Sequence, residues 1–118
     1  MIQFNYMIVY FFGTWIGFGR CTNHGGGYES EYRIVFGSDY SWSLETNQST
    51  FRGTWGSSVV HGRHLVSVRT EDSPWMWNGL YSVRIGQNDL ILFMDRPWQV
   101  DCTIHLVREA LDLSKGVD

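Results

Sequence analysis

The sequence predicts an all-β protein, a small antiparallel up-and-down β-barrel of about eight strands that forms a single domain over residues 1–118. Short stretches of alternating apolar and polar residues are separated by clusters of Gly, Asn, Asp and Ser, which is typical of strands joined by turns. The chain has six Trp, six Tyr, seven Phe and thirteen Gly but only two Pro, and large rings favour strands. Because no long amphipathic helix is available to cover a sheet, closure into a barrel is the simplest way to remove both sheet edges.

The N-terminal third is expected to begin with strands. Residues 2–12 place Ile2, Phe4 and Tyr6 on one side of an extended chain, and this alternation predicts a first strand. Gly13 interrupts it, and residues 14–19 predict a second strand or a continuation of the first. Residues 20–27 read Arg-Cys-Thr-Asn-His-Gly-Gly-Gly and are predicted to form a loop.

The rest of the chain predicts strands at short, regular spacing. They are expected at residues 32–36, 40–45, 50–55, 64–70, 76–85, 89–94 and 100–107. Turn-forming residues fill each gap, including Gly-Ser-Ser at 56–58. Residues 109–115 are the one stretch expected to form a helical turn or two.

Several short motifs resemble the lipocalin-like calycins, a family of small up-and-down barrels. The resemblance rests on Gly-Thr-Trp at 13–15, on Arg108 in the segment His-Leu-Val-Arg, and on the order of strands between them. It implies that Trp15 packs across a closed end of the barrel and that Arg108 stacks over it. The resemblance covers residues 13–108, whereas residues 1–12 form an extra segment that small members of the family do not need.

Pairing the first barrel strand with the last follows from this resemblance. In an antiparallel pair, the residue numbers of facing positions add up to a constant. Setting Trp15 opposite Arg108 gives 123, and Cys21 with Cys102 gives the same total. The same register therefore brings the two cysteines of the chain together, so that Cys21 and Cys102 are a candidate disulfide.

The charge balance argues against a nucleic-acid partner. The net charge is -3, and the basic residues are scattered singly, whereas binding to phosphates needs clustered Lys and Arg. No stretch reaches the ~18 to 20 apolar residues of a membrane span. The first residues lack the basic region of a secretory signal, so we expect them to belong to a soluble folded domain. The cellular compartment and the oligomeric state are left open.

The sequence shows no signature of a cofactor, a metal or a catalytic centre. The two cysteines have no zinc-binding spacing, and the four histidines are expected on the surface. They are His24, His61, His64 and His105. A catalytic Ser or Cys would need a base and an orienting acid, and no such set is recognisable. The sequence therefore favours a protein without enzymatic activity and indicates no catalytic residue.

Aromatic residues are the best candidates for a binding site. Trp75 and Trp77 face the same way on an extended chain. Together with Trp98 they are expected either to line the barrel mouth as a ligand contact or to plug that end of the barrel as part of its core. Tyr40, Trp42 and Tyr81 are expected to line a pocket. Arg84 is a candidate for orienting an anionic ligand.

Two functions are therefore predicted, with a small barrel enzyme as a third alternative. The first is a non-enzymatic binding module that holds a small apolar or amphipathic molecule in the barrel or at its aromatic rim. The alternative is a protein-interaction or inhibitor domain with a solid core and an exposed aromatic surface. The internal volume separates them, since a cavity of several hundred cubic ångströms would indicate a carrier and a solid core would indicate an interaction domain.

Overall fold

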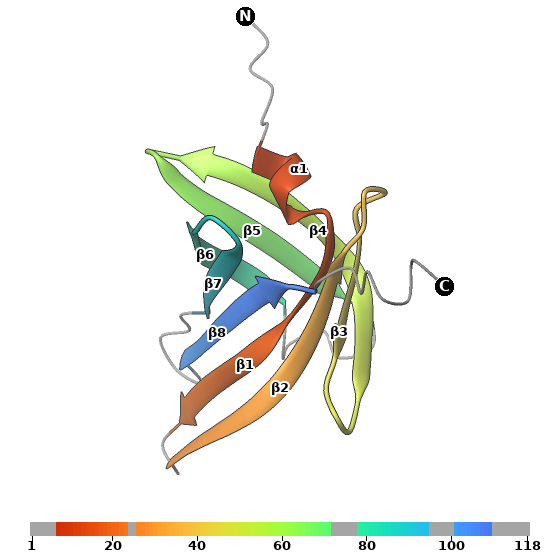
Figure 1. Cartoon of the computed structure of the whole chain (residues 1–118), viewed down its shortest axis with the longest axis vertical. Coiled ribbons are helices and arrows are strands. Elements are labelled where there is room, and N and C mark those ends of the chain that lie inside the picture. The colour runs from red at the N-terminus through yellow and green to blue at the C-terminus, as the bar shows by residue number, and fades with distance from the viewer. Residues whose placement is uncertain (1–6, 24–25, 72–77, 95–100, 110–118) are drawn as a thin grey trace, which may run out of the picture.

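The computed structural model describes residues 7–23, 26–71, 78–94 and 101–109. In them, eight strands form a closed antiparallel barrel, in which each strand pairs with the next and β8 returns to β1 (Figure 1). This confirms the predicted fold class. The elements are α1 (Met7–Phe11), β1 (Gly13–Asn23), β2 (Gly26–Phe36), β3 (Ser41–Glu45), β4 (Thr50–Val60), β5 (Arg63–Thr70), β6 (Gly79–Ile85), β7 (Asp89–Met94) and β8 (Asp101–Arg108).

The pairing of β1 with β8 has the predicted register. Trp15 stands opposite Arg108, and Cys21 stands opposite Cys102. Cys102 is disulfide-bonded, and Cys21 is the only other cysteine of the chain. The pairing of β8 with β1, which closes the barrel, therefore brings together residues from opposite ends of the chain.

The prediction of a strand over residues 2–12 is wrong for its described part, because residues 7–11 form the short helix α1. β1 already pairs with β2 on one side and β8 on the other. A closed barrel leaves no edge to which another strand could bind. The backbone of α1 is held by side chains instead, since the indole Nε1 of Trp15 donates to the carbonyl of Phe11 at 2.9 Å.

The predicted loop at residues 20–27 is also wrong for most of its length. β1 continues to Asn23, and β2 begins at Gly26 with Thr22 paired to Gly27. Gly is unfavourable in strands, but the β1–β2 pairing continues through Gly26 and Gly27. The Arg20 and Glu29 side chains, which stand opposite each other, form an ion pair of 3.5 Å. The result is a long β1–β2 ribbon.

β4 passes through the turn predicted at residues 56–58 and ends at Val60. The real turn is formed by His61 and Gly62, whose φ angles are 50° and 76°. Tight hairpins need two residues with positive φ at this place. Gly56 instead pairs with Ser67 within the ladder.

The remaining strand boundaries agree with the prediction to within a few residues. β7 has the predicted bounds, while β6 begins at Gly79. Residues 2–6, 76–77, 100 and 110–115 of the predicted elements lie outside the described residues.

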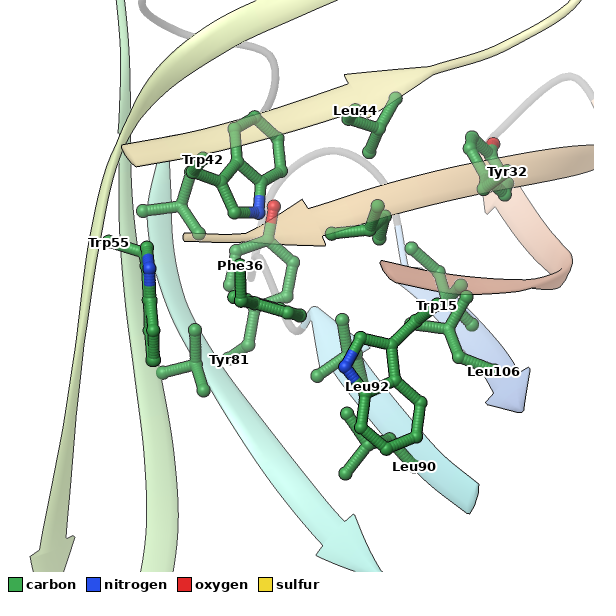
Figure 2. Packing of buried hydrophobic residues seen from close by; sticks show 14 of the residues in the cluster. Trp15, Tyr32, Phe36, Trp42, Leu44, Trp55, Tyr81, Leu90, Leu92 and Leu106 are labelled. Atoms are coloured by element: carbon green, nitrogen blue, oxygen red, sulfur yellow. The ribbon is translucent and has the colours of Figure 1, made fainter. Parts of the chain in front are cut away.

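Side chains from all eight strands and from α1 fill the barrel interior (Figure 2). The buried apolar residues are Phe11, Trp15, Tyr32, Ile34, Phe36, Trp42, Leu44, Trp55, Val66, Val68, Tyr81, Leu90, Leu92, Cys102, Ile104 and Leu106. With this many rings inside, the strands must approach closely at some points. At Gly53, a Cβ atom would lie 1.9 Å from the carbonyl oxygen of Arg69 on β5.

We expect Gly53→Ala to destabilise the barrel, since the added methyl group would push against the β5 backbone. Overpacking of this kind costs about 1–3 kcal/mol. Gly56→Ala on the same strand is the control, because its Cβ would lie 3.3 Å from the movable hydroxyl of Ser67. Urea unfolding measures both variants, and equal stability of the two would contradict the close approach at Gly53.

We also expect Cys21 and Cys102 to form the disulfide. Replacing both with Ser should lower the free energy of unfolding by ~2–4 kcal/mol, because the bond closes a long loop of the unfolded chain. In non-reduced protein, neither thiol should react with iodoacetamide after denaturation. Two alkylated cysteines in oxidised protein would show that the register does not bring the sulfur atoms together.

Candidate functional site

Arg108 and Trp15 lie together at the end of the barrel that α1 covers. The guanidinium carbon of Arg108 is 4.3 Å from the centre of the buried Trp15 ring. The same guanidinium donates to the carbonyl oxygen of Phe12 at 2.8 Å and to that of Tyr10. Arg108 therefore links the last strand to α1 through a cation–π contact and two charge-assisted hydrogen bonds.

A cluster of rings completes this closed end. Phe36 and Trp55 have their centres 4.9 Å apart, and Phe11 lies 5.8 Å from Phe36. The Trp55 Nε1 donates to the carbonyl of Gly37 at 3.0 Å. The sequence Gly-Thr-Trp occurs at 13–15 and again at 53–55. Trp15 and Trp55 thus both pack in this end, and each donates its indole N–H to a backbone carbonyl, a shared role that the sequence did not reveal.

Tyr10 fixes α1 on the side of the β6–β7 turn. Its hydroxyl donates to the carbonyl of Gly86 at 2.7 Å and lies 3.1 Å from that of Asp89. Burial is the main cause that raises the pKa of Tyr10 above its ordinary value. The phenol therefore stays protonated and keeps its donor role at neutral pH.

Of the predicted pocket residues, Trp42 and Tyr81 come together inside the barrel, whereas Tyr40 and Arg84 lie elsewhere. Trp42 and Tyr81 are buried inside the barrel, with exposed fractions of 4% and 2%. Tyr40 is half exposed in the turn between β2 and β3 and packs against Trp55 at 6.0 Å. Arg84 is on the outer face of β6, 5.8 Å from the ring of Phe93. Tyr40 and Arg84 therefore do not line the interior.

The tryptophans expected at the barrel mouth, Trp75, Trp77 and Trp98, lie outside the described residues. The segments that contain them join β5 to β6 and β7 to β8. These strands end, in the direction of the chain, opposite the end that α1 covers. Tyr40 lies at the α1 end, in the turn between β2 and β3.

The described interior has little room for a ligand. A void of about 10 Å³ lies between Trp42, Tyr81 and their apolar neighbours. One water molecule needs about this much space, whereas small-molecule pockets have roughly 300–1,000 Å³. Around Trp42 and Tyr81, the described core therefore leaves no space for a ligand, as expected for the alternative with a solid core.

An outer groove of about 650 Å³ lies against β1, β2 and β8 and is bounded by the residues that follow β3. Ile16, Phe18 and Val107 form its apolar floor, and their exposed fractions are 37%, 62% and 47%. Glu31, Arg33, Glu45, Asn47 and His105 are among its polar lining residues. The combination of a broad apolar floor with a few polar groups is typical of a binding site.

The polar groups around the outer groove are mostly paired with one another. Arg33 forms ion pairs with Glu45 at 3.6 Å and with Glu109 at 3.4 Å. The Nε2 of His105 lies 2.8 Å from the carboxylate of Asp89. The described lining of the groove contains neither Ser nor Cys that this histidine could activate.

The described part of the chain has neither a cluster of metal ligands nor a membrane-spanning helix. No three His, Cys, Asp or Glu side chains there are grouped as metal ligands would be. His61 lies in the β4–β5 turn and His64 on β5, while His24 lies outside the described residues. No helix in this part is both long and apolar enough to cross a membrane.

Sequence reasoning missed the outer groove, although a signal for it was present. Ile16 and Phe18 alternate with inward-facing Trp15 and were counted only as strand residues. Exposed large apolar side chains next to each other are unusual on a surface. The predicted register, which sets Ile16 opposite Val107, could have indicated the patch.

We expect Arg108→Lys to destabilise the closed end, because a lysine ammonium cannot replace a guanidinium that binds two carbonyls and stacks on a ring. A loss of about 1.5–3 kcal/mol in the free energy of unfolding corresponds to one hydrogen bond of a charged donor. Arg69→Lys on the exposed side of β5 is the matched control. Equal stability of both variants in urea unfolding would contradict the linking role of Arg108.

Comparisons with known proteins agree with the fold alone. No protein-family model matches the chain, and no curated protein matches its sequence. Among solved structures, the chain is similar to a de novo designed fluorescence-activating β-barrel, with a TM-score of 0.53 and 11% sequence identity. The match covers 92% of this chain and 100% of the designed one. At this level of identity, the chain shares with that protein the architecture of a small β-barrel.

Proposed function

We propose that the protein is a non-enzymatic binding module that holds a small amphipathic molecule in the outer groove. The observation that carries the proposal is the contrast between the volume of this groove, about 650 Å³, and the interior void of about 10 Å³. The groove has the size of small-molecule sites in proteins. Its apolar floor and polar edge suit a ligand that is apolar on one side and polar on the other.

We further infer that the barrel is lipocalin-like. The contact of Arg108 with Trp15 and the pairing of β1 with β8 support this inference. In contrast to the expectation of a ligand inside the barrel, the proposed ligand lies on the outside. The designed barrel to which the chain is similar is described as fluorescence-activating, which agrees with a binding role for this architecture but does not locate a site here.

A protein partner is the second candidate, and the outer surface favours it. Val9, Leu80 and Tyr40 have exposed fractions of 61%, 57% and 49% and lie outside the groove lining. Stable protein interfaces bury about 800 Å² on each partner. A protein partner could bury exposed side chains of this kind outside the groove, whereas a small ligand in the groove would not.

Titration with octyl glucoside below its micelle concentration tests the first candidate. We expect the amide resonances of Ile16, Phe18 and Val107 to shift in two-dimensional NMR spectra. Val107→Ser should weaken the binding about fivefold, since burial of part of a Val side chain contributes ~1 kcal/mol. Val60→Ser is the matched control, because Val60 is exposed to 46% and lies at the far end of β4, outside the groove lining.

Two outcomes would contradict this proposal. Shifts that centre on Trp42 and Tyr81 would place the ligand inside the barrel. Unchanged spectra up to the micelle concentration would remove the small-molecule site and leave the protein partner as the remaining candidate.

A further inference from the structure

We infer that the outer groove selects a positively charged amphipathic molecule, with its apolar part on Ile16 and Val107 and its cationic group between Phe18 and Glu31. This inference rests on the proposed function and names the class of ligand. It follows from how the strand register arranges the outward-facing side chains, and from which of their charges are already paired.

The register forms a small grid on the outer surface. On β1, Ile16 has Val107 as its neighbour on β8 and Arg33 as its neighbour on β2. Two residues further, Phe18 has His105 on one side and Glu31 on the other. Because side chains two apart point the same way, the apolar half of the grid and the half with Phe18 and Glu31 form one continuous surface.

Glu31 is a carboxylate of the groove lining that has no ion-pair partner among the described residues. Among the described residues, it has no ion pair and no hydrogen bond through its side chain, whereas Glu29 pairs with Arg20 and Glu45 pairs with Arg33. A smaller pocket of about 310 Å³ beside the groove is also lined by Glu31, Phe18 and Asn47. A cationic group at this position would contact the carboxylate of Glu31, which lines both the groove and the smaller pocket.

The surrounding charges favour a cation over an anion. Arg33 is the one arginine of the described lining, and two carboxylates, from Glu45 and Glu109, already neutralise it. Asp89 adds a further negative charge beside His105. An anionic head group would meet the repulsion of Glu31 without an available arginine. Arg84, expected from the sequence to orient an anion, lies over Phe93 on β7.

Phe18 supplies the second half of the cation site. Its exposed fraction of 62% leaves much of its ring surface open to a ligand, and it stands directly opposite Glu31 across the β1–β2 ribbon. Directly opposed side chains have Cβ atoms about 4.5–5.5 Å apart. A cation can therefore lie over the ring and beside the carboxylate at once, which combines a cation–π contact with an ion pair.

The test compares three probes with the same octyl chain: octyltrimethylammonium, octyl glucoside and octyl sulfate. NMR titrations at low salt and below the micelle concentrations give a dissociation constant for each. We expect the cation to bind about tenfold more tightly than the glucoside, since a cation–π contact and an exposed ion pair act together. The sulfate should bind more weakly than the glucoside. Raising the salt concentration should reduce the preference for the cation.

Variants show whether Glu31 is responsible for the selection. Glu31→Gln should bring the affinity for octyltrimethylammonium close to that for octyl glucoside and leave the glucoside affinity unchanged. Glu71→Gln is the control, because it removes the same charge at an exposed position after β5, outside the groove. Phe18→Leu keeps an apolar side chain and should weaken the binding of the cation more than that of the glucoside.

The outcomes separate this inference from the proposed function. Equal affinities of the three probes, or equal effects of Glu31→Gln and Glu71→Gln, would overturn the selection of a cation. If the glucoside still bound and Val107→Ser still weakened it, the groove would remain a site for neutral amphipathic molecules. If none of the probes bound, both proposals would be wrong.

Discussion

The link between Arg108 and Trp15 is the interaction on which the rest of the structure depends. It joins the end of the last strand to the start of the first, and through the carbonyls of Tyr10 and Phe12 it also holds α1 over that end of the barrel. With one end closed by rings and the sheet closed on itself, no edge is left on which another strand could pair. Residues 7–11 therefore form a helical cover instead of a further strand.

The aromatic side chains that close one end of the barrel also fill much of its interior. An eight-stranded barrel has room for its own side chains or for one small ligand, and here tryptophans, tyrosines and phenylalanines take up this space. The void that is left beside Trp42 is too small for a ligand of ordinary size. In the described part of the molecule, the proposed binding site is therefore on the outer face, where Phe18 and Val107 are exposed.

The outer groove has its chemistry because the closed sheet places β1 between β2 and β8. The apolar floor comes mainly from β1 and β8, and the carboxylates come from β2 and β3. Pairing of Arg33 with Glu45 and Glu109 neutralises the positive charge and leaves Glu31 without a partner among the described residues. With two carboxylates and one arginine in its described lining, the groove is thus negative at the point where a ligand would meet Phe18.

The sequence by itself determined the fold class and most of the strands, because alternation shows which side chains face inward. The resemblance to lipocalin-like barrels suggested the pairing of Trp15 with Arg108, and the constant residue-number total then set Cys21 opposite Cys102. Only the tertiary structure decided the helix α1, the continuation of strands through glycines such as Gly56, and the outer groove. Each of these features depends on parts of the chain that are distant in the sequence. The helix α1 forms because the closed barrel has no free edge, Gly56 stays in a strand because β5 pairs with it, and the groove forms where β1, β2 and β8 lie side by side. Local residue preferences contain none of this information, because it arises when the sheet closes.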